Sequence, residues 1–384
     1  MPFIGNQPTA VPLTSSDLED NIISTAKIQD NAVTAAKYVE PILFRNIIIN
    51  GDMSIAQRGT SQSGVGASDV YLIDRFQLDT NATPSARFTM SQDTDVPSGQ
   101  GFSKSLKLDC TTAQTSYSSN QLVAVVQRIE GQMLQYLKYG TSSAESLTLS
   151  FWVKSNKTGT YTLELDQAGN GKDYSQTYTI SSANTWEKKT LTFNGDTATA
   201  LANDNTEELE VNFWLAAASD FTSGTLNTSW NSTVNANRVS SSQVNIADST
   251  ANEWYITGVQ LEAGTSASDF EFLPYDVNLR RCQRYCQKHT DPHLVGVNNS
   301  SNLPSRVGMT LPVILRTTPS TSISGTFGFW DGGATANYTS VSAFFNNANS
   351  IQMDFSGSTF SVAGKTNIQY LSSGSNYVLI DAEL

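Results

Sequence analysis

Apolar and polar residues alternate along a series of short segments between residues 146 and 264, and this alternation constrains the fold more than any other feature. In SLTLSFWVKS, Leu147, Leu149, Phe151 and Val153 occupy every second position. Side chains of a strand point to opposite faces with a period of two, so this segment is predicted to be a half-buried β-strand. Strands at such spacing predict a sandwich rather than an α/β fold. Similar segments span residues 158–167, 174–181, 185–196, 208–219 and 253–264.

The pattern predicts three parts in an all-β protein. Residues 1–40 form an N-terminal repeat arm, residues 41–276 a β-sandwich, and residues 277–384 a short helix followed by a small C-terminal β domain. The helix is expected over residues 277–289, after Pro274 and Asp276. A Ser/Thr/Asn-rich loop over residues 222–252 is long for a compact domain, and such loops often bind ligands or lie at interfaces.

The N-terminal arm contains a short internal repeat, LEDNIISTAK followed by IQDNAVTAAK, over residues 18–37. The unit is too short to bury its apolar residues alone, so they are expected to pack on another copy or another protein. Such self-similarity usually marks stacked or intertwined chains. The alternative is a flexible arm whose repeat is accidental. The candidate attachment residues are Leu18, Ile22, Ile23, Ile28 and Val33.

Charge and composition exclude several classes of function. The net charge is −12, and no Lys/Arg cluster occurs beyond LRRCQR, which argues against nucleic-acid binding. No stretch is long enough to span a bilayer, and MPFIGNQPTAVPL lacks the features of a secretory signal. The abundance of Ser, Thr, Asn and Gly is typical of extracellular β-proteins. A virion protein, folded in the host cytoplasm and released by lysis, reconciles these observations.

Two cysteines and both histidines lie within twelve residues, as C-x3-C-x2-H-x3-H. Cys282 and Cys286 would share one face of the expected helix, but His289 would lie further round it, and Pro292 ends any helix before His293. Zinc ligands usually come from separate elements, so no metal site is predicted here. The alternative is a three-fold assembly that brings three copies of His289 or His293 together on its axis.

Acidic residues on the strands offer weak candidates for chemistry. Glu164 and Asp166 are two residues apart and share a face, and the interpretation favoured for them is a solvated outer face. The stretch DQAGNGKD, residues 166–173, lacks ligands of a calcium loop and is predicted to be a hairpin turn. No nucleophile elbow or phosphate loop is present, so the protein is not expected to be an enzyme.

Sugar binding would use exposed aromatic rings beside hydrogen-bonding side chains. Trp230 lies among polar residues in the long loop, and Trp330 and Tyr338 lie in the C-terminal part. These three are the candidate ligand-binding residues, although a structural role for Trp230 is equally consistent with its sequence. Trp152, Trp214 and Trp254 lie in apolar strand patterns and are expected in the core.

Several motifs in order resemble a widespread type of bacteriophage tail-fibre or virion appendage protein. They are the repeat arm, NIIINGDMSIAQRGTS with YLIDRF, EWYITGVQLEAG through CQRYCQK, GMTLPVILRTTPS and the terminal IDAEL, which together cover most of the chain. The strands LTLSFWVKSNKTGTY and TWEKKTLTF are also similar to those of jelly-roll carbohydrate-binding modules. That second resemblance implies a jelly-roll sandwich and leaves room for a structural calcium ion, with no other cofactor expected.

The resemblance implies a structural protein of the virion, on its tail or particle surface. It would be a homotrimer that attaches to other phage proteins through its N-terminus and contacts host-surface glycans. Neither nucleic-acid binding nor membrane insertion is implied. Two alternatives remain open, a polysaccharide depolymerase tailspike and a head-surface or adaptor protein with no ligand role.

Overall fold

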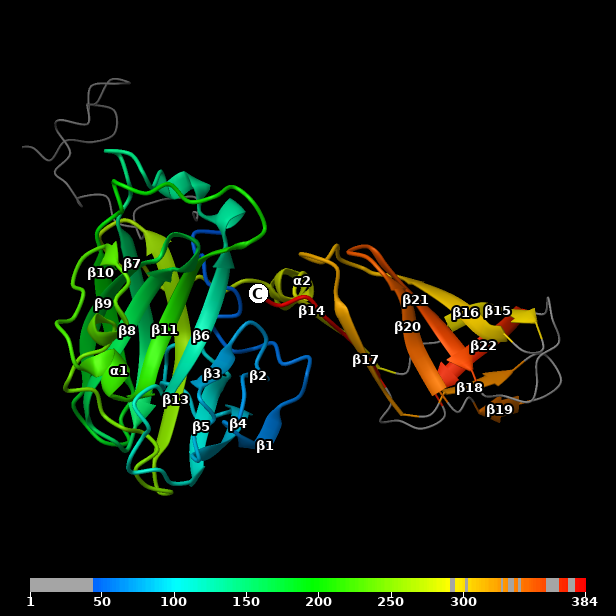
Figure 1. The fold of residues 1–384 in the computed structure, drawn as a ribbon, viewed down its shortest axis with the longest axis horizontal. Helices are drawn as coiled ribbons and strands as arrows, with labels where there is room; N and C mark the ends of the chain where they lie inside the picture. The colour runs from blue at the N-terminus through cyan, green and yellow to red at the C-terminus, as the bar shows by residue number, and fades with distance from the viewer. Residues whose placement is uncertain are drawn as a thin grey trace, which may run out of the picture. The chain divides into compact units, whose positions relative to one another are not determined.

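The computed structural model confirms an all-β protein built around a jelly-roll β-sandwich (Figure 1). It describes residues 44–290, 294–300, 303–325, 327–330, 335–337, 340–356, 366–371 and 377–384. The expected repeat arm, with its candidate attachment residues, lies outside these ranges. The described helices include none with the length and apolar character needed to cross a membrane.

Two large sheets make up the sandwich, and their neighbouring strands pair antiparallel. The six-stranded sheet has the order β1 (Ser61–Val65), β4 (Arg87–Asp93), β5 (Ser105–Thr112), β13 (Glu253–Ala263), β7 (Leu147–Ser155) and β10 (Glu187–Phe193). The seven-stranded sheet has the order β12 (Asn231–Ser232), β9 (Lys172–Ile180), β8 (Gly159–Gln167), β11 (Glu207–Ala217), β6 (Leu122–Glu130), β3 (Gln77–Asn81) and β2 (Val70–Tyr71).

The core between the sheets follows the alternation in the sequence. Leu147, Leu149, Phe151 and Val153 of β7 are all fully buried, and they pack with inward-facing residues of the opposite sheet such as Phe213. Trp254 is also fully buried in this core, as expected. Trp152 is only half-buried, so its assignment to the core was wrong, because it follows the outward-facing register of β7.

The outer face of the seven-stranded sheet carries a second, smaller apolar cluster. Strand β6 presents Leu122, Ala124 and Val126 outward, opposite to the core-facing Val123 and Val125. The short helix α1 (Ser219–Thr222) and the long loop that follows it cover this cluster through Phe221 and Val239, which contact Trp214 and its neighbours. The loop therefore holds part of an outer sheet face away from water.

The segment after the sandwich differs from the expected helix over residues 277–289. Helix α2 spans Tyr275–Gln283, and strand β14 already begins at Cys286 (Cys286–Thr290). The prediction of one continuous helix was wrong, because Cys286 pairs with Asp381 of β23 (Tyr377–Asp381) and becomes buried against it. This pairing joins residues almost a hundred positions apart, which local sequence patterns do not reveal.

Two further sheets form the C-terminal part, with an apolar cluster of their own that includes Val307, Met353 and Ile380. The predicted boundary between residues 276 and 277 stays a prediction. One sheet has the order β14, β23 and β17 (Ser320–Ser324). The other has the order β19 (Thr335–Asn337), β18 (Phe327–Trp330), β22 (Thr366–Leu371), β15 (Leu294–Ser300), β16 (Leu303–Thr310), β21 (Ser350–Ser356) and β20 (Ser340–Asn346).

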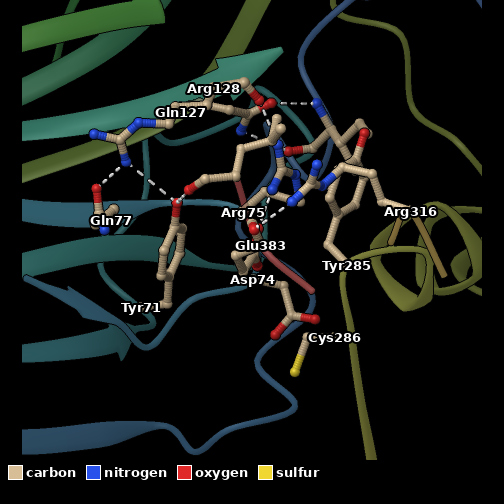
Figure 2. A network of polar contacts seen from close by, with 12 residues as sticks. Tyr71, Asp74, Arg75, Gln77, Gln127, Arg128, Tyr285, Cys286, Arg316 and Glu383 are labelled. Carbon is tan, nitrogen blue, oxygen red and sulfur yellow. Dashed lines mark hydrogen bonds and ion pairs between the residues drawn. The ribbon is translucent and has the colours of Figure 1, made fainter. Parts of the chain in front are cut away.

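A network of buried polar groups joins segments from several of the sequence motifs at Glu383 (Figure 2). Its carboxylate forms ion pairs with Arg75 and, at 3.3 Å, with Arg58, while Arg75 Cζ lies 3.5 Å from the centre of the Tyr285 ring. Arg316 donates a hydrogen bond to the Glu383 carbonyl at 2.8 Å. YLIDRF, CQRYCQK and IDAEL therefore meet in a structural cluster, with opposite charges in direct contact.

The segment NGD at residues 50–52 packs directly on β13. Val259 donates a backbone hydrogen bond to the Gly51 carbonyl at 2.9 Å, and a Cβ atom on Gly51 would lie 2.0 Å from the Val259 carbonyl oxygen. No side chain fits in that space, so a glycine is required here.

We expect Gly51→Ala to lower the free energy of unfolding by ~1–3 kcal/mol, the usual range for overpacking. Urea denaturation followed by tryptophan fluorescence measures the change. Gly308→Ala is the matched control, because a Cβ atom there meets no atom of the described residues within 4 Å. Equal stabilities of the two variants would show that the contact with Val259 relaxes freely.

Candidate functional site

A cavity of about 310 Å³ lies on the outer face of the seven-stranded sheet of the sandwich, which contains β8 and β11. It adjoins the apolar cluster under the long loop. Its volume is at the lower end of the ~300–1,000 Å³ typical of small-ligand sites. Ala168 and Gly171, from the turn between β8 and β9, line it at one side, and Thr233 and Arg238 of the long loop also line it. Strands β3, β6, β8 and β11 contribute outward-facing side chains, namely Asp79, Ala124, Asp166, Glu210, Asn212 and Trp214.

Arg238 ties the long loop to the sheet through two carboxylates. Its Nε donates to Glu164 Oε1 at 2.7 Å, and its Nη2 donates to Glu164 Oε2 and to Asp166 Oδ2, both at 3.0 Å. Glu164 is fully buried and also accepts a hydrogen bond from Trp214 Nε1 at 2.9 Å. The prediction that Glu164 and Asp166 lie on a solvated face was wrong, because Arg238 and the long loop cover the outer face of β8.

A second guanidinium, from Arg128 of β6, neutralises acidic groups on the neighbouring strands. Its Nε donates to Glu210 at 2.8 Å and lies 3.3 Å from a Glu207 oxygen. Asp79 is more distant, with 3.9 Å between its carboxylate and Arg128 Nη2. Asp79 and Glu210 line the cavity, so this group of charges forms one side of the site.

Burial and mutual repulsion shift the pKa values of these carboxyl groups. Burial, and then the neighbouring Glu164, raise the pKa of Asp166 to about 7. Burial, and then Asp69, raise the pKa of Asp79 to about 7. Burial acts to raise the pKa of Glu210, but the hydrogen bond from Glu207 and the charge of Arg128 outweigh it and lower that pKa. Near neutral pH the cavity therefore holds ionised and partly protonated carboxyl groups side by side.

The aromatic residues selected from the sequence do not line this cavity where the structure describes them. Trp230 is half-buried, donates from Nε1 to the Asn194 carbonyl at 2.6 Å, and packs edge to face on Tyr139 and Tyr174. Trp330 belongs to β18, and its side chain lies outside the described part, as does Tyr338. Ligand binding by these three residues stays a prediction.

The cysteine and histidine motif is divided between two elements. Cys282 of α2 and Cys286 of β14 are both buried, and burial raises the pKa of both thiols well above the usual value. Burial also lowers the pKa of His289, and His293 is not among the described residues. Within the described ranges, no group of three His, Cys, Asp or Glu side chains is arranged to hold a metal ion.

Sequence reasoning missed most of the residues around the cavity. Trp214 is buried as expected, but it packs in the outer cluster and lines the cavity. Glu210, Asn212 and Trp214 occupy alternate positions of β11, so their common outward face was readable from the sequence. No local signal pointed to Arg238, which reaches β8 from a loop more than seventy residues away.

Comparisons with known proteins give fold-level likenesses only. No family model matches the chain, and no curated protein matches it in sequence. Among solved structures, the enzymatically active domain of tailspike protein 4 from bacteriophage CBA120 aligns over 57% of this chain and 21% of its own, with 18% identity and a TM-score of 0.31. The chain therefore spans about a fifth of that protein's length.

Two carbohydrate-binding modules are matched over almost their whole length. The family 11 module from Clostridium thermocellum aligns over 54% of this chain and 97% of its own, with 10% identity and a TM-score of 0.27. The CBM22-2 xylan-binding domain from Paenibacillus barcinonensis aligns over 50% and 92%, with 14% identity and a TM-score of 0.28. The assignment to the all-β sandwich class stands on the strand pairing described above.

Proposed function

We propose that the protein is a structural component of a bacteriophage particle, a fibre or appendage that contacts glycans on the host surface. Residues 1–40 attach it to the virion, and the sandwich provides the glycan site. The motifs that resemble phage appendage proteins support the first part. The cavity on the outer face of the seven-stranded sheet, lined by Asp79, Asp166, Glu210 and Asn212, carries the second.

Such a site suits a polyhydroxylated ligand. Carboxylates and an amide accept and donate hydrogen bonds at fixed positions, and Trp214 and Ala124 add apolar surface at the sheet. Binding at one cavity is expected to be weak. Several copies of the chain on one particle would raise the avidity, because linked sites bind together at high effective concentration.

The test measures retention of the purified protein on immobilised bacterial capsular and lipopolysaccharide glycans. Ala168→Trp places a large ring at an exposed position that lines the cavity, so we expect at least ~10-fold weaker retention, about 1.4 kcal/mol. Ala183→Trp is the matched control, because Ala183 is exposed in another turn and does not line the cavity. Equal retention of both variants would move the glycan site elsewhere, and no retention of any protein would favour an adaptor without a ligand.

A second candidate, glycan cleavage, is favoured by one observation. Asp166, with its pKa raised to about 7, lines the same cavity as Glu210, whose pKa is lowered. A protonated and an ionised carboxyl group are the pair that glycoside hydrolysis uses. New reducing ends in the retention assay, lost in both Asp166→Asn and Glu210→Gln, would make the protein a depolymerase. Retention without new ends supports binding alone.

A further inference from the structure

Carboxyl groups outnumber cationic groups among the described residues in and around the cavity. Only two guanidinium groups, Arg128 and Arg238, lie among them. Lys172, next to Gly171 in sequence, is instead bound to Asp196 at 2.8 Å. Seven carboxyl groups interact with one another there, and Tyr71 also contacts Arg128; the seven are Asp69, Asp79, Glu164, Asp166, Asp173, Glu207 and Glu210.

Most hydrogen-bond donors at the cavity are already engaged by these carboxylates. Trp214 Nε1 and Arg238 Nε bind Glu164, and Arg238 Nη2 binds Glu164 and Asp166. Asn212 Nδ2 donates to Glu164 and Glu210, both at 3.3 Å. A ligand therefore meets mainly acceptor atoms, while Arg238 Nη1 and the Thr233 hydroxyl make no hydrogen bond to the described residues and are left as donors.

The Asn212 side chain provides a second, independent indication of a ligand. Asn212 is only 2% exposed and lines the cavity. Its Nδ2 atom has partners, but its Oδ1 atom makes no hydrogen bond within the described part of the chain. The Oδ1 atom is not among the fully enclosed polar atoms of the described residues, so it stays open to the cavity and can accept a hydrogen bond from a ligand.

From this geometry we infer that the cavity selects a glycan that carries a protonated amine. An alkylammonium group has three donors and no acceptor, which complements Asn212 Oδ1 and the carboxylates of Asp79, Asp166 and Glu210. Its positive charge reduces the repulsion among those carboxylates, as a neutral hydroxyl group does not. Hydroxyl groups of the sugar accept from Arg238 Nη1. This inference rests on the proposed glycan site.

The affinity for such a ligand should rise with pH. The raised pKa values of Asp79 and Asp166, both about 7, mean that these groups lose their protons as the pH passes through neutrality. A bound ammonium group favours the ionised carboxylates, so binding strengthens as they ionise. A primary alkylamine resembles a lysine side chain and stays protonated from about pH 6 to about pH 8.

The test uses three hexasaccharide probes with one backbone, 6-amino-6-deoxycellohexaose, its N-acetylated form and cellohexaose, titrated calorimetrically against the full chain. We expect the amine to bind at least ~10-fold more tightly than the other two, a difference of about 1.4 kcal/mol. That preference should grow with pH, disappear in Ala168→Trp and persist in Ala183→Trp. Asp79→Asn should reduce it several-fold without unfolding the protein, because Asp79 is the carboxylate least tightly held by Arg128.

Each other outcome has a defined meaning. Equal binding of the three probes overturns the amine preference but leaves the proposed glycan site intact. Binding of calcium chloride alone, lost in Ala168→Trp, overturns it in favour of a metal site. If the amine does not bind while envelope polysaccharides are retained through the cavity, the ligand class is wrong. If nothing is retained in either assay, the proposed function fails and the inference fails with it.

Discussion

Glu383→Gln should lower the free energy of unfolding by ~3–5 kcal/mol, the loss typical of breaking a buried ion pair from one side. The Arg75 side chain is 1% exposed and that of Arg58 is 8% exposed, so neither guanidinium can turn to water when Glu383 loses its charge. Arg75 also packs on the Tyr285 ring, and Tyr285 donates to Glu130 at 2.5 Å. The loss of stability should therefore extend from the residues around Glu383 to Tyr285 and to Glu130 at the end of β6.

The Glu383→Gln variant should also lose its structure first in a defined part of the chain. Glu383 lies two residues after the end of β23, and β23 holds β14 through pairs such as Cys286 with Asp381. Hydrogen exchange and limited proteolysis should show early opening at residues 377–384. Glu145→Gln is the matched control, because the Glu145 and Lys138 side chains are 43% and 54% exposed, and an exposed pair contributes less than ~1 kcal/mol. Equal loss in the two variants would mean that the Glu383 network does not stabilise the fold.

This network shows which structural role the residues of the sequence motifs have in the fold. The segments that carry the resemblance to phage appendage proteins, YLIDRF, CQRYCQK and IDAEL, converge on Glu383 and Arg75 (Figure 2). A further motif joins them, since Gln57 of NIIINGDMSIAQRGTS donates to the Cys286 carbonyl at 2.7 Å. The motifs are thus mainly devices that hold distant segments together. None of the described residues that line the cavity belongs to these motifs.

The inner half of the sandwich could be predicted from the sequence because burial there obeys a period of two. Leu149 and Phe151 face the core because they occupy every second position of the same strand. The outer face could not be predicted in the same way. Polar residues such as Glu164 and Asn212 follow the register of an exposed face, yet a loop from elsewhere in the chain buries them. Their environment depends on tertiary contacts that no local pattern encodes.

Trp230 and Trp214 show the same limit from opposite directions. Trp230 has polar neighbours in sequence, which left a ligand role and a structural role equally open; its half-buried ring packs on Tyr139 and Tyr174 and does not line the cavity, and ligand binding by it stays a prediction. Trp214 lies in an apolar strand pattern and was assigned to the core, but it lines the cavity. The neighbouring residues in the sequence indicate whether a residue lies in a strand or a loop. They do not indicate which part of the outer sheet face the long loop covers.

Arg238→Met should also destabilise the protein by ~3–5 kcal/mol, and the loss should depend on pH. Arg238 supplies two of the hydrogen bonds that hold the fully buried Glu164 carboxylate, at 2.7 and 3.0 Å. Without the guanidinium, burial favours the protonated form and raises the folded-state pKa of Glu164 further. A carboxyl group with a raised folded-state pKa destabilises the fold as pH rises through that pKa, so the variant should lose least in acid and most above neutrality.

A double-mutant cycle separates the buried charge from the loss of contacts by the long loop. Glu164→Gln keeps an acceptor for Trp214 Nε1 but removes the charge, so Glu164→Gln/Arg238→Met should recover much of the stability lost in Arg238→Met. Urea denaturation of the four proteins at about pH 5 and about pH 8 brackets the expected titration. If the two single losses simply add at both pH values, the carboxylate and the guanidinium act independently. Arg238 would then serve only to pack the loop, and its pairing with the carboxylates would not be what holds the cavity together.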